Sequence, residues 1–183
     1  MKTLILNGSP RENGDTAALV AYLREHLLGE VKIVNIRKSR ISPCMDCRTC
    51  RRKPGCVISD DMQEIYEYLK TCDNVVIASP VHFSELTGQL LNAASRLQTY
   101  YSARYFRKEE PLLSRKKGAV ILAGGGNGKP QKAYDTAVDL LHYMNAHEVF
   151  PMVYSGNTDR VPAAEDRAAL RDVRRAAEFL SSP

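Results

Sequence analysis

Short apolar runs alternate with longer segments whose apolar residues recur at helical spacing, and this alternation continues along most of the chain. The runs are rich in Val, Ile and Leu and are bounded by turn residues, as buried strands are. Strands that alternate with helices form an open parallel sheet with helices on both faces, so the predicted fold class is doubly wound α/β. The sequence predicts strands at 2–7, 31–36, 74–80, 118–126 and 147–155, and helices at 16–28, 60–72, 86–97, 131–146 and 163–180.

Two details of the pattern refine this prediction. Pro151 lies within the last strand, and proline lacks the N–H that a central strand donates, so this strand is expected at an edge or with a bulge. The last helix has an apolar face, as a helix that closes the fold does. The residues of that face are Leu170, Val173, Ala177 and Leu180.

A chain of 183 residues that is 44% hydrophobic is long enough to bury a sizeable core and has the size of one domain. We therefore predict a single domain at 1–183, with a cysteine-rich loop at 41–59. The first apolar run is short and ends at Asn7, so it resembles neither a signal peptide nor the roughly 20 apolar residues that cross a membrane. The expected location is the cytoplasm, without a membrane partner.

Lys and Arg outnumber Asp and Glu by 26 to 21, which gives a net charge of +5 and a pI near 9.0. This charge suits phosphate-bearing small molecules or nucleic acid. The chain has no Trp and no recognisable nucleic-acid-binding motif, and its basic residues concentrate around the cysteine loop and at 104–117. Nucleic acid is therefore not expected as a partner.

Ligands of parallel α/β sheets bind beyond the carboxyl ends of the strands, so the loops that follow strands carry the candidate chemistry. The first, NGSPRENGDT at 7–16, joins a strand to a helix and offers backbone N–H groups, the hydroxyls of Ser9 and Thr16, and the charge of Arg11. These groups form a predicted phosphate site. The loop matches neither a Walker A motif nor a dinucleotide fingerprint, and an ordinary turn that caps the helix is the alternative.

Two further loops have the groups that a flat heteroaromatic ligand requires. In SPVHFSE at 79–85, Pro80 stiffens the turn and the rings of His82 and Phe83 suit the edge and face of such a ligand. In AGGGNGKP at 123–130 the glycines allow the backbone to approach a ligand closely, although a flexible loop without a ligand is the alternative.

Four cysteines share the spacing C-x2-C-x2-C-x5-C, and the first three of them have the spacing of a ferredoxin-type cluster motif. A reducing cytosol disfavours disulfides, and structural zinc usually takes two separated pairs of cysteines. Basic residues around the loop favour thiolates and offset the charge of an anionic cluster. The alternative is that these residues are solvated or contact NAD(P)H phosphates while the thiols stay free. The predicted ligands are Cys44, Cys47, Cys50 and Cys56, and the basic residues are Arg37, Lys38, Arg40, Arg48, Arg51, Arg52 and Lys53.

The segments GSPRENGDT, SPCMDCRTCRRKPGCVISDDM and ASPVHF, in this order, resemble the NAD(P)H-dependent FMN reductase and iron-sulfur flavoprotein family of the flavodoxin-like superfamily. The resemblance covers nearly the whole chain and is strongest in its first hundred residues. It implies a five-stranded sheet of order 2-1-3-4-5, non-covalent FMN, and homodimers or homotetramers in which a neighbouring subunit helps to cover the flavin.

The resemblance also assigns residues. It implies that the FMN phosphate is surrounded by Ser9, Arg11, Asn13, Asp15 and Thr16, that the isoalloxazine is bordered by Pro80, Val81, His82 and Phe83, and that the third ligand loop contains Gly124, Gly125 and Gly126. The chain departs from the family at Asp15, where Asn is usual, at His82, where Tyr is common, and at Ser95-Arg96, where an Asp-Arg pair is common. Because a carboxylate repels a phosphate, we expect Asp15 to cap the helix instead.

The expected activity is that of an FMN-dependent oxidoreductase that passes electrons from NAD(P)H to a small-molecule or protein acceptor, with a four-iron, four-sulfur (4Fe-4S) cluster as a further carrier. The flavin carries the chemistry, so no catalytic side chain is predicted. The alternative is a flavin-binding electron carrier or redox sensor without NAD(P)H turnover.

The remaining candidate residues are expected to have structural roles. We expect Asp60 and Asp61 to cap a helix, and Cys72 to be buried and inert. We expect the histidines to have packing or surface roles, and the aromatic segment 99–106 to form a subunit interface or flavin cover.

Overall fold

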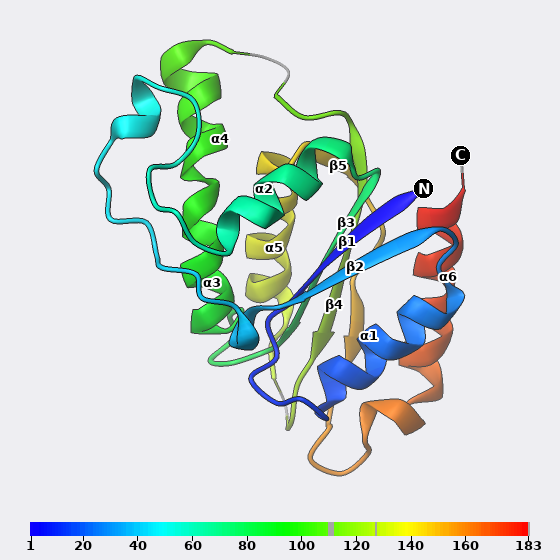
Figure 1. Ribbon diagram of the computed structural model, residues 1–183. Coiled ribbons are helices and arrows are strands. Elements are labelled where there is room, and N and C mark those ends of the chain that lie inside the picture. Colours follow the sequence, from blue (N-terminus) through cyan, green and yellow to red (C-terminus); the bar gives the residue numbers. More distant parts are fainter. Residues whose placement is uncertain (110–111, 127, 183) are drawn as a thin grey trace.

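The computed structural model describes residues 1–109, 112–126 and 128–182 (Figure 1). Its strands are β1 (Lys2–Asn7), β2 (Glu30–Asn35), β3 (Asn74–Pro80), β4 (Lys116–Ala123), β5 (Ala146–Val149) and β6 (Val153–Ser155). Its helices are α1 (Asp15–His26), α2 (Met62–Thr71), α3 (Gly88–Ala94), α4 (Gln98–Ser102), α5 (Gln131–Tyr143) and α6 (Arg167–Ser181). Shorter helical turns are η1 (Ile36–Lys38), η2 (Thr49–Arg51), η3 (Ser95–Leu97), η4 (Ala103–Arg107) and η5 (Ala163–Glu165).

All strand pairs of the sheet are parallel, and the order β2-β1-β3-β4-β5 confirms the predicted order. The strand predicted at 147–155 is divided into β5 and β6, and both segments pair with β4 at the same edge of the sheet. Pro151 lies between them, where its missing N–H interrupts no ladder, so the predicted edge strand with an irregularity is confirmed.

Helices cover both faces of the sheet (Figure 1). Because side chains alternate along a strand, Leu4 and Leu6 face the core under α2, α3 and α5, whereas Ile5 faces the core under α1 and α6. The predicted face of α6 lies in the second core, where Val173, Ala177 and Leu180 are buried and Leu170 is partly buried.

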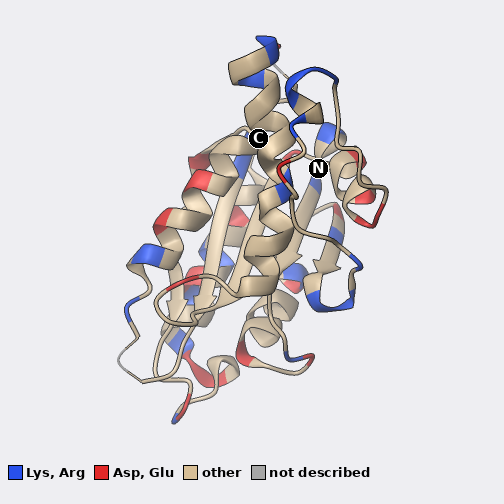
Figure 2. Cartoon of the chain, turned by 90° about the vertical axis from the view of Figure 1, so that its left-hand side faces the viewer, with Lys and Arg blue, Asp and Glu red and all other residues tan. Residues whose placement is uncertain are grey.

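The helix predicted at 86–97 begins at Gly88, where the Thr87 side chain caps it, and the helical segment continues through α3, η3, α4 and η4 as far as Arg107. This long segment extends beyond the sheet, and the cysteine loop that follows β2 lies against it (Figure 1). Figure 2 views the molecule from the side of this loop and marks its basic segments in blue. The loops after β1, β3 and β4 lie together at the carboxyl edge of the sheet, at the end opposite η4 (Figure 1).

Candidate functional site

The first loop is organised by Ser9, whose side chain is buried. Its hydroxyl donates to the Arg11 carbonyl at 2.8 Å and accepts from the Arg11 N–H at 3.2 Å, while its own N–H donates to Asn7 Oδ1 at 3.0 Å. These three bonds hold the turn that leads into α1. The side chains of Arg11 and Asn13 lie exposed on this turn.

The N-terminus of α1 lies at the end of this loop, with Gly14 as the residue before the helix and Thr16 buried in the first turn. Among the described residues, no side chain caps this helix. The first N–H groups of a helix have no partner within the helix, and they carry the positive end of its dipole. This end of α1 therefore has the donors that a phosphate requires.

The expectation that Asp15 caps α1 is wrong. Asp15 has helical geometry as the first residue of α1, so its carboxylate cannot reach back to the first-turn N–H groups as a cap does. Oδ1 instead accepts from the N–H of Ala163 at 3.0 Å, and Oδ2 accepts from Arg11 Nη2 at 3.2 Å. Asp15 thus ties the first loop to η5.

The second loop contains a tight turn that the sequence did not reveal. His82 and Glu85 exchange two backbone hydrogen bonds of 2.9 Å, and the two residues between them, Phe83 and Ser84, have φ values of 54° and 63°. Asn and Gly usually occupy such a turn because left-handed geometry costs other residues about 1–2 kcal/mol each. The Phe83 side chain is fully exposed, at 102%. The turn therefore presents an uncovered aromatic ring beside the carboxyl edge.

The first and second loops are joined at Gly8 and Thr87. The Gly8 N–H donates to the Ala78 carbonyl at 2.8 Å, and Thr87 Oγ1 donates to the Gly8 carbonyl at 2.8 Å. A Cβ at position 8 would lie 2.9 Å from Leu90 Cβ, so only glycine fits here without a shift. Sequence reasoning missed both residues, although a Thr immediately before a helical pattern is an N-cap signal.

The third loop packs against the loop that follows β6. Gly124 donates its N–H to the Ser155 carbonyl at 2.9 Å and accepts from the Thr158 N–H at 3.1 Å. A Cβ at Gly125 would lie 2.3 Å from both carboxylate oxygens of Asp159, and Gly126 has a φ of 57°. The group that approaches Gly125 so closely is thus Asp159 of the same chain, a residue that the sequence did not single out.

The four cysteines of the loop line one cavity, together with Arg48, Arg96 and Ser102 among others. The Cys44 N–H donates to Ser95 Oγ at 2.9 Å, the Cys50 thiol donates to Ser102 Oγ at 3.3 Å, and Arg107 donates to the Cys50 carbonyl. These bonds attach the loop to the helical segment. Within the described ranges, no three His, Cys, Asp or Glu side chains are arranged so that they could hold a metal ion.

The thiols differ in their surroundings. Hydrogen bonds from the backbone and hydroxyl of Thr49 lower the pKa of Cys47, which lies at the surface. Cys72 lies in the core under α2, so the prediction of a buried thiol is confirmed, and burial raises its pKa to about 11, which disfavours the reactive thiolate. Cys47 is therefore the more readily ionised of the two.

Arg96 holds both ends of the cysteine loop, and its side chain is buried, with 1% of the residue exposed. Nη1 donates to the Ser42 carbonyl at 2.9 Å and to Asp60 Oδ2 at 2.8 Å, and Nη2 donates to the Ile58 carbonyl at 3.0 Å. The sequence did not predict this ion pair because its partners are 36 positions apart.

Asp60 also accepts from the N–H groups of Ser42 at 2.9 Å and Met62 at 3.1 Å, so it contacts the start of α2 as expected. Asp61 accepts from the Arg40 N–H at 2.7 Å and makes no side-chain cap to α2, which corrects the expectation for that residue. Burial acts to raise the pKa of Asp60, but the bonds from Arg96, Ser42 and Met62 outweigh it and lower the pKa.

The basic residues around the cysteines have several roles. Arg48 and Arg51 line the cysteine cavity, and the Arg51 guanidinium lies 4.3 Å from the centre of the Phe106 ring. Arg37 and Lys38 instead pair with Glu12 of the first loop, so these two cations lie beside the predicted phosphate site and not beside the thiols. Glu12 links the two loops.

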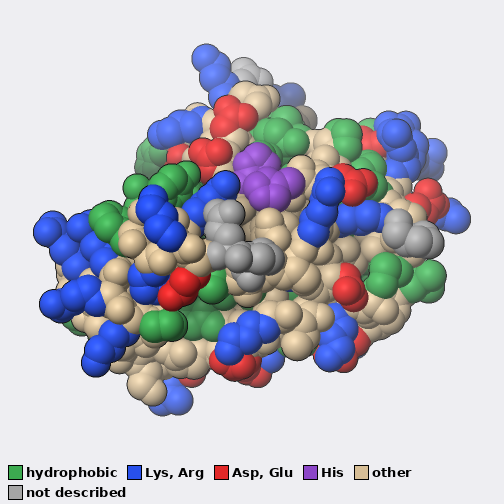
Figure 3. All heavy atoms as spheres, turned by 90° about the horizontal axis from the view of Figure 1, so that it is seen from above, with side chains coloured by type: hydrophobic (Ala, Val, Ile, Leu, Met, Phe, Trp, Pro, Cys, Tyr) green, Lys and Arg blue, Asp and Glu red, His purple; other side chains and the backbone are tan. Residues whose placement is uncertain are grey.

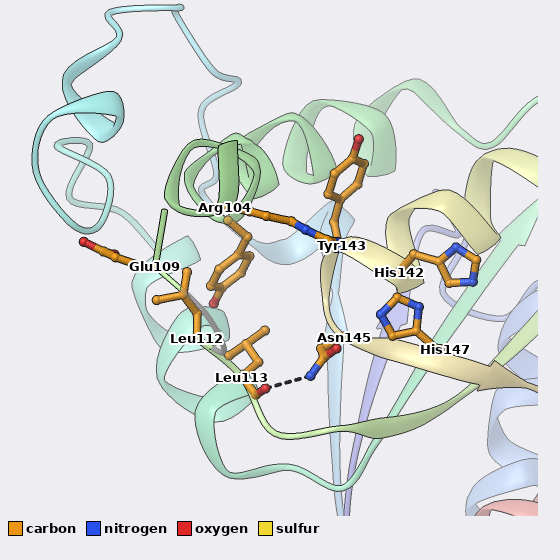
Figure 4. Close-up of a pocket in the computed structure, with 9 residues that line it drawn as sticks. Arg104, Glu109, Leu112, Leu113, His142, Tyr143, Asn145 and His147 are labelled. Atoms are coloured by element: carbon orange, nitrogen blue, oxygen red, sulfur yellow. Dashed lines mark hydrogen bonds between the residues drawn. The ribbon is translucent and has the colours of Figure 1, made fainter. Parts of the chain in front are cut away.

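A second cavity lies at the amino edge of the sheet, between α5, β5 and the helical segment (Figure 4). The rings of His142 and His147 stack there with centroids 4.9 Å apart, and Asn145 Nδ2 donates to the Leu113 carbonyl at 2.7 Å. Histidines lie side by side at the surface in Figure 3, with basic side chains nearby. Partial burial, His142 and nearby arginines lower the pKa of His147, which disfavours a second charge in the pair.

Residues 1–159 match the family model described as NADPH-dependent FMN reductase. The chain belongs to this family. Among curated proteins, an iron-sulfur flavoprotein of Methanosarcina thermophila is 29% identical over 98% of this chain and 93% of its own length. An iron-sulfur flavoprotein of Methanocaldococcus jannaschii is 33% identical over 76% of this chain and 70% of its own length. This FMN reductase family member is therefore an oxidoreductase.

Solved structures share the fold. The NAD(P)H:quinone oxidoreductase of Methanothermobacter marburgensis matches with a TM-score of 0.76 at 16% identity, over 100% of this chain and 97% of that one. An FMN-dependent NADH-azoreductase of Bacillus anthracis, solved with FMN, matches with a TM-score of 0.68 at 16% identity over both whole chains. The predicted flavodoxin-like fold is confirmed for this FMN reductase family member. In the described part of the chain, no helix is both long and apolar enough to cross a membrane.

Proposed function

We propose that this chain is an FMN-dependent oxidoreductase that takes electrons from NADH or NADPH and passes them to an acceptor, with a 4Fe-4S cluster at Cys44, Cys47, Cys50 and Cys56 as a further carrier. The observation that carries the flavin part is the N-terminus of α1, which lies at the end of β1 without a side-chain cap. A phosphate is the group that such a helix end binds best.

The three loops would contact different parts of a bound flavin. The first-turn N–H groups of α1, with Thr16 beside them and Arg11 on the adjacent turn, would hold the phosphate, and Asn13 lies on the same turn. The segment Pro80–Phe83 and the loop Gly124–Gly126 would border the ring. When bound, FMN supplies hydride acceptance and electron transfer, so the protein needs no general acid or base of its own.

The cysteine cavity supports the cluster part. Four thiols line it, and the buried Arg96 with Arg48 and Arg51 supplies the positive charge that an anionic cluster requires. Asp46 and Arg48, which flank Cys47, have left-handed φ values of 48° and 60°, so the loop turns tightly between its first and third cysteines. The donor set therefore suits iron and sulfide.

One observation favours a second candidate, a flavin-binding redox sensor that does not turn over NAD(P)H. Cys47 is exposed and its pKa is lowered, as in thiols that react with oxidants. Steady oxidation of NADH or NADPH by the FMN-loaded protein, with a quinone as acceptor, would support the enzyme. Reduction of the flavin for a single turnover only would support the sensor.

The decisive experiment is anaerobic purification, followed by an absorption spectrum and by iron, sulfide and flavin assays on the same sample. We expect flavin bands, a broad iron-sulfur shoulder and about four irons per chain. Cys56→Ser should lose the iron, whereas Cys72→Ala, which removes the thiol outside the loop, should keep it. A wild-type protein with flavin and no iron would contradict the cluster, and one that does not bind added FMN would contradict the whole proposal.

A further inference from the structure

The Nε–H group of Arg96 is the feature that the loop contacts do not explain. Its two Nη atoms have three acceptors, but Nε has no hydrogen-bond partner among the described residues. Leaving a buried donor without an acceptor destabilises the fold, and more so when the donor is charged. A native protein that retains such an atom usually has an acceptor for it that the chain alone does not supply.

The surroundings of Arg96 indicate what that acceptor is. Arg96 lines the cavity that the four cysteines share, and Cys56 interacts with it electrostatically. The carbonyls of Ser42 and Ile58 and the Asp60 carboxylate are already occupied by the Nη atoms. Among the groups that line the cavity, the Cys56 sulfur is the one that interacts with Arg96 and does not already bind its Nη atoms.

We propose that Arg96 Nε–H donates a hydrogen bond to a sulfur at the Cys56 side of the cavity, and that this bond and the guanidinium charge raise the reduction potential of the cluster. The inference rests on the proposed cluster. Reduction adds one electron and so increases the negative charge on the sulfurs. A donor and a positive charge beside them therefore stabilise the reduced form more than the oxidised form.

Burial distinguishes Arg96 from the other cations of the loop. The Arg48 side chain is 63% exposed and pairs with Asp46 at 3.2 Å, so water and salt screen its charge. The Arg96 side chain has no exposed surface, and the charge that offsets it is the carboxylate of Asp60 at 2.8 Å. Arg96 and Asp60 should therefore affect the cluster with opposite signs.

The test measures the midpoint potential of the cluster by redox titration with electron paramagnetic resonance, on anaerobically purified wild type, Arg96→Gln and Asp60→Asn, each with its iron content. We expect Arg96→Gln to lower the reduction equilibrium constant about tenfold, which is 59 mV for one electron. Asp60→Asn should shift the potential upward, because it removes a negative charge and keeps Nε. A role that is only structural would not give shifts of opposite sign.

An unchanged potential in Arg96→Gln with full iron content, or shifts of the same sign in both variants, would overturn the inference. If Arg96→Gln does not retain iron, wild type grown with 15N-arginine should show a 15N coupling to the reduced cluster, and its absence would overturn the inference. A wild type that holds no iron refutes the proposed cluster itself, which is a separate outcome.

Discussion

Phe83 and Ser84 occupy left-handed backbone positions that usually belong to Asn and Gly, and the Phe83 ring is fully exposed. A strained backbone persists where the surrounding structure holds it, and it is often found at ligand sites. The hydrogen bonds between His82 and Glu85 hold this turn at the carboxyl edge. We infer that the turn is kept because it presents the ring to the flavin.

This interpretation predicts a difference between two glycine substitutions. Phe83→Gly and Ser84→Gly should each raise the free energy of unfolding by about 1 kcal/mol, because each relieves a left-handed residue. Only Phe83→Gly should weaken FMN binding, by about tenfold, because it removes an aromatic contact. Urea unfolding and quenching of FMN fluorescence measure the two effects. Equal FMN affinity in both variants would show that the ring has no role in binding.

A second pair of glycines tests the contact between the first loop and α3. Gly8→Ala should destabilise the protein by about 1–3 kcal/mol and weaken FMN binding, since the new methyl group would lie 2.9 Å from Leu90 and the loop must shift. Gly88→Ala is the matched control, because no atom lies within 4 Å of its Cβ position. It should stabilise α3 by about 0.5 kcal/mol. Chemical unfolding curves with similar midpoints for both variants would contradict the packing described here.

At the scale of elements, the cysteine loop is held by one buried ion pair between Asp60 and Arg96 and by the hydrogen bonds around it. Because these bonds lower the pKa of Asp60, the carboxylate stabilises the fold at pH values above its unfolded pKa, about 3.9. This stabilisation declines as the pH falls from there through the lower pKa of the folded state.

Asp60→Asn should therefore lower the free energy of unfolding by about 3 kcal/mol at pH 7, as the loss of one partner of a buried pair does. The difference from wild type should shrink at pH 3 and below. Asp61→Asn is the control: among the described residues its carboxylate accepts a hydrogen bond from the backbone N–H of Arg40 alone, and an amide oxygen can replace it. Urea unfolding at several pH values measures both variants. A difference that does not change with pH would exclude this ionic contribution.

At the scale of the whole molecule, the helical segment α3–η4 connects the two candidate sites, because α3 contacts the first loop and η3 to η4 contact the cysteine loop. Its outer surface includes Tyr105 and Phe106, which are 49% and 46% exposed. Interfaces are enriched in such aromatic residues. The predicted homodimer or homotetramer would place its contact on this segment.

Sedimentation of the wild-type protein should then give the mass of a dimer or tetramer. Phe106→Glu should raise the dissociation constant of this oligomer at least tenfold and so increase the fraction of monomer. Leu28→Glu is the control, since Leu28 is an apolar residue after α1 that is more exposed than Phe106, at 65%, and lies outside this segment. Association that is the same in both variants would place the interface elsewhere.

The alternation of apolar runs and helical patterns determined by itself most strands and helices of this protein, because burial of a strand or helix face leaves a short-range period in the sequence. It did not predict α4 and η4, which extend the third predicted helix to Arg107. The cysteine spacing and the three loops after strands could also be identified from the sequence, because each of them is a contiguous segment. The sheet order came from the resemblance of those segments to a family, and the structure confirmed it.

Only the tertiary structure decided which residues meet across the chain. Asp60 and Arg96 are 36 positions apart, and Asp15 and Ala163 are 148 apart, so no local period relates them. Asp15 was expected at a helix cap because a carboxylate repels a phosphate, yet the position of η5 gave its carboxylate another donor. Such contacts depend on how the elements pack, and local spacing in the sequence does not encode that packing. The contacts fix the shape of the loops and therefore which ligands the loops can bind.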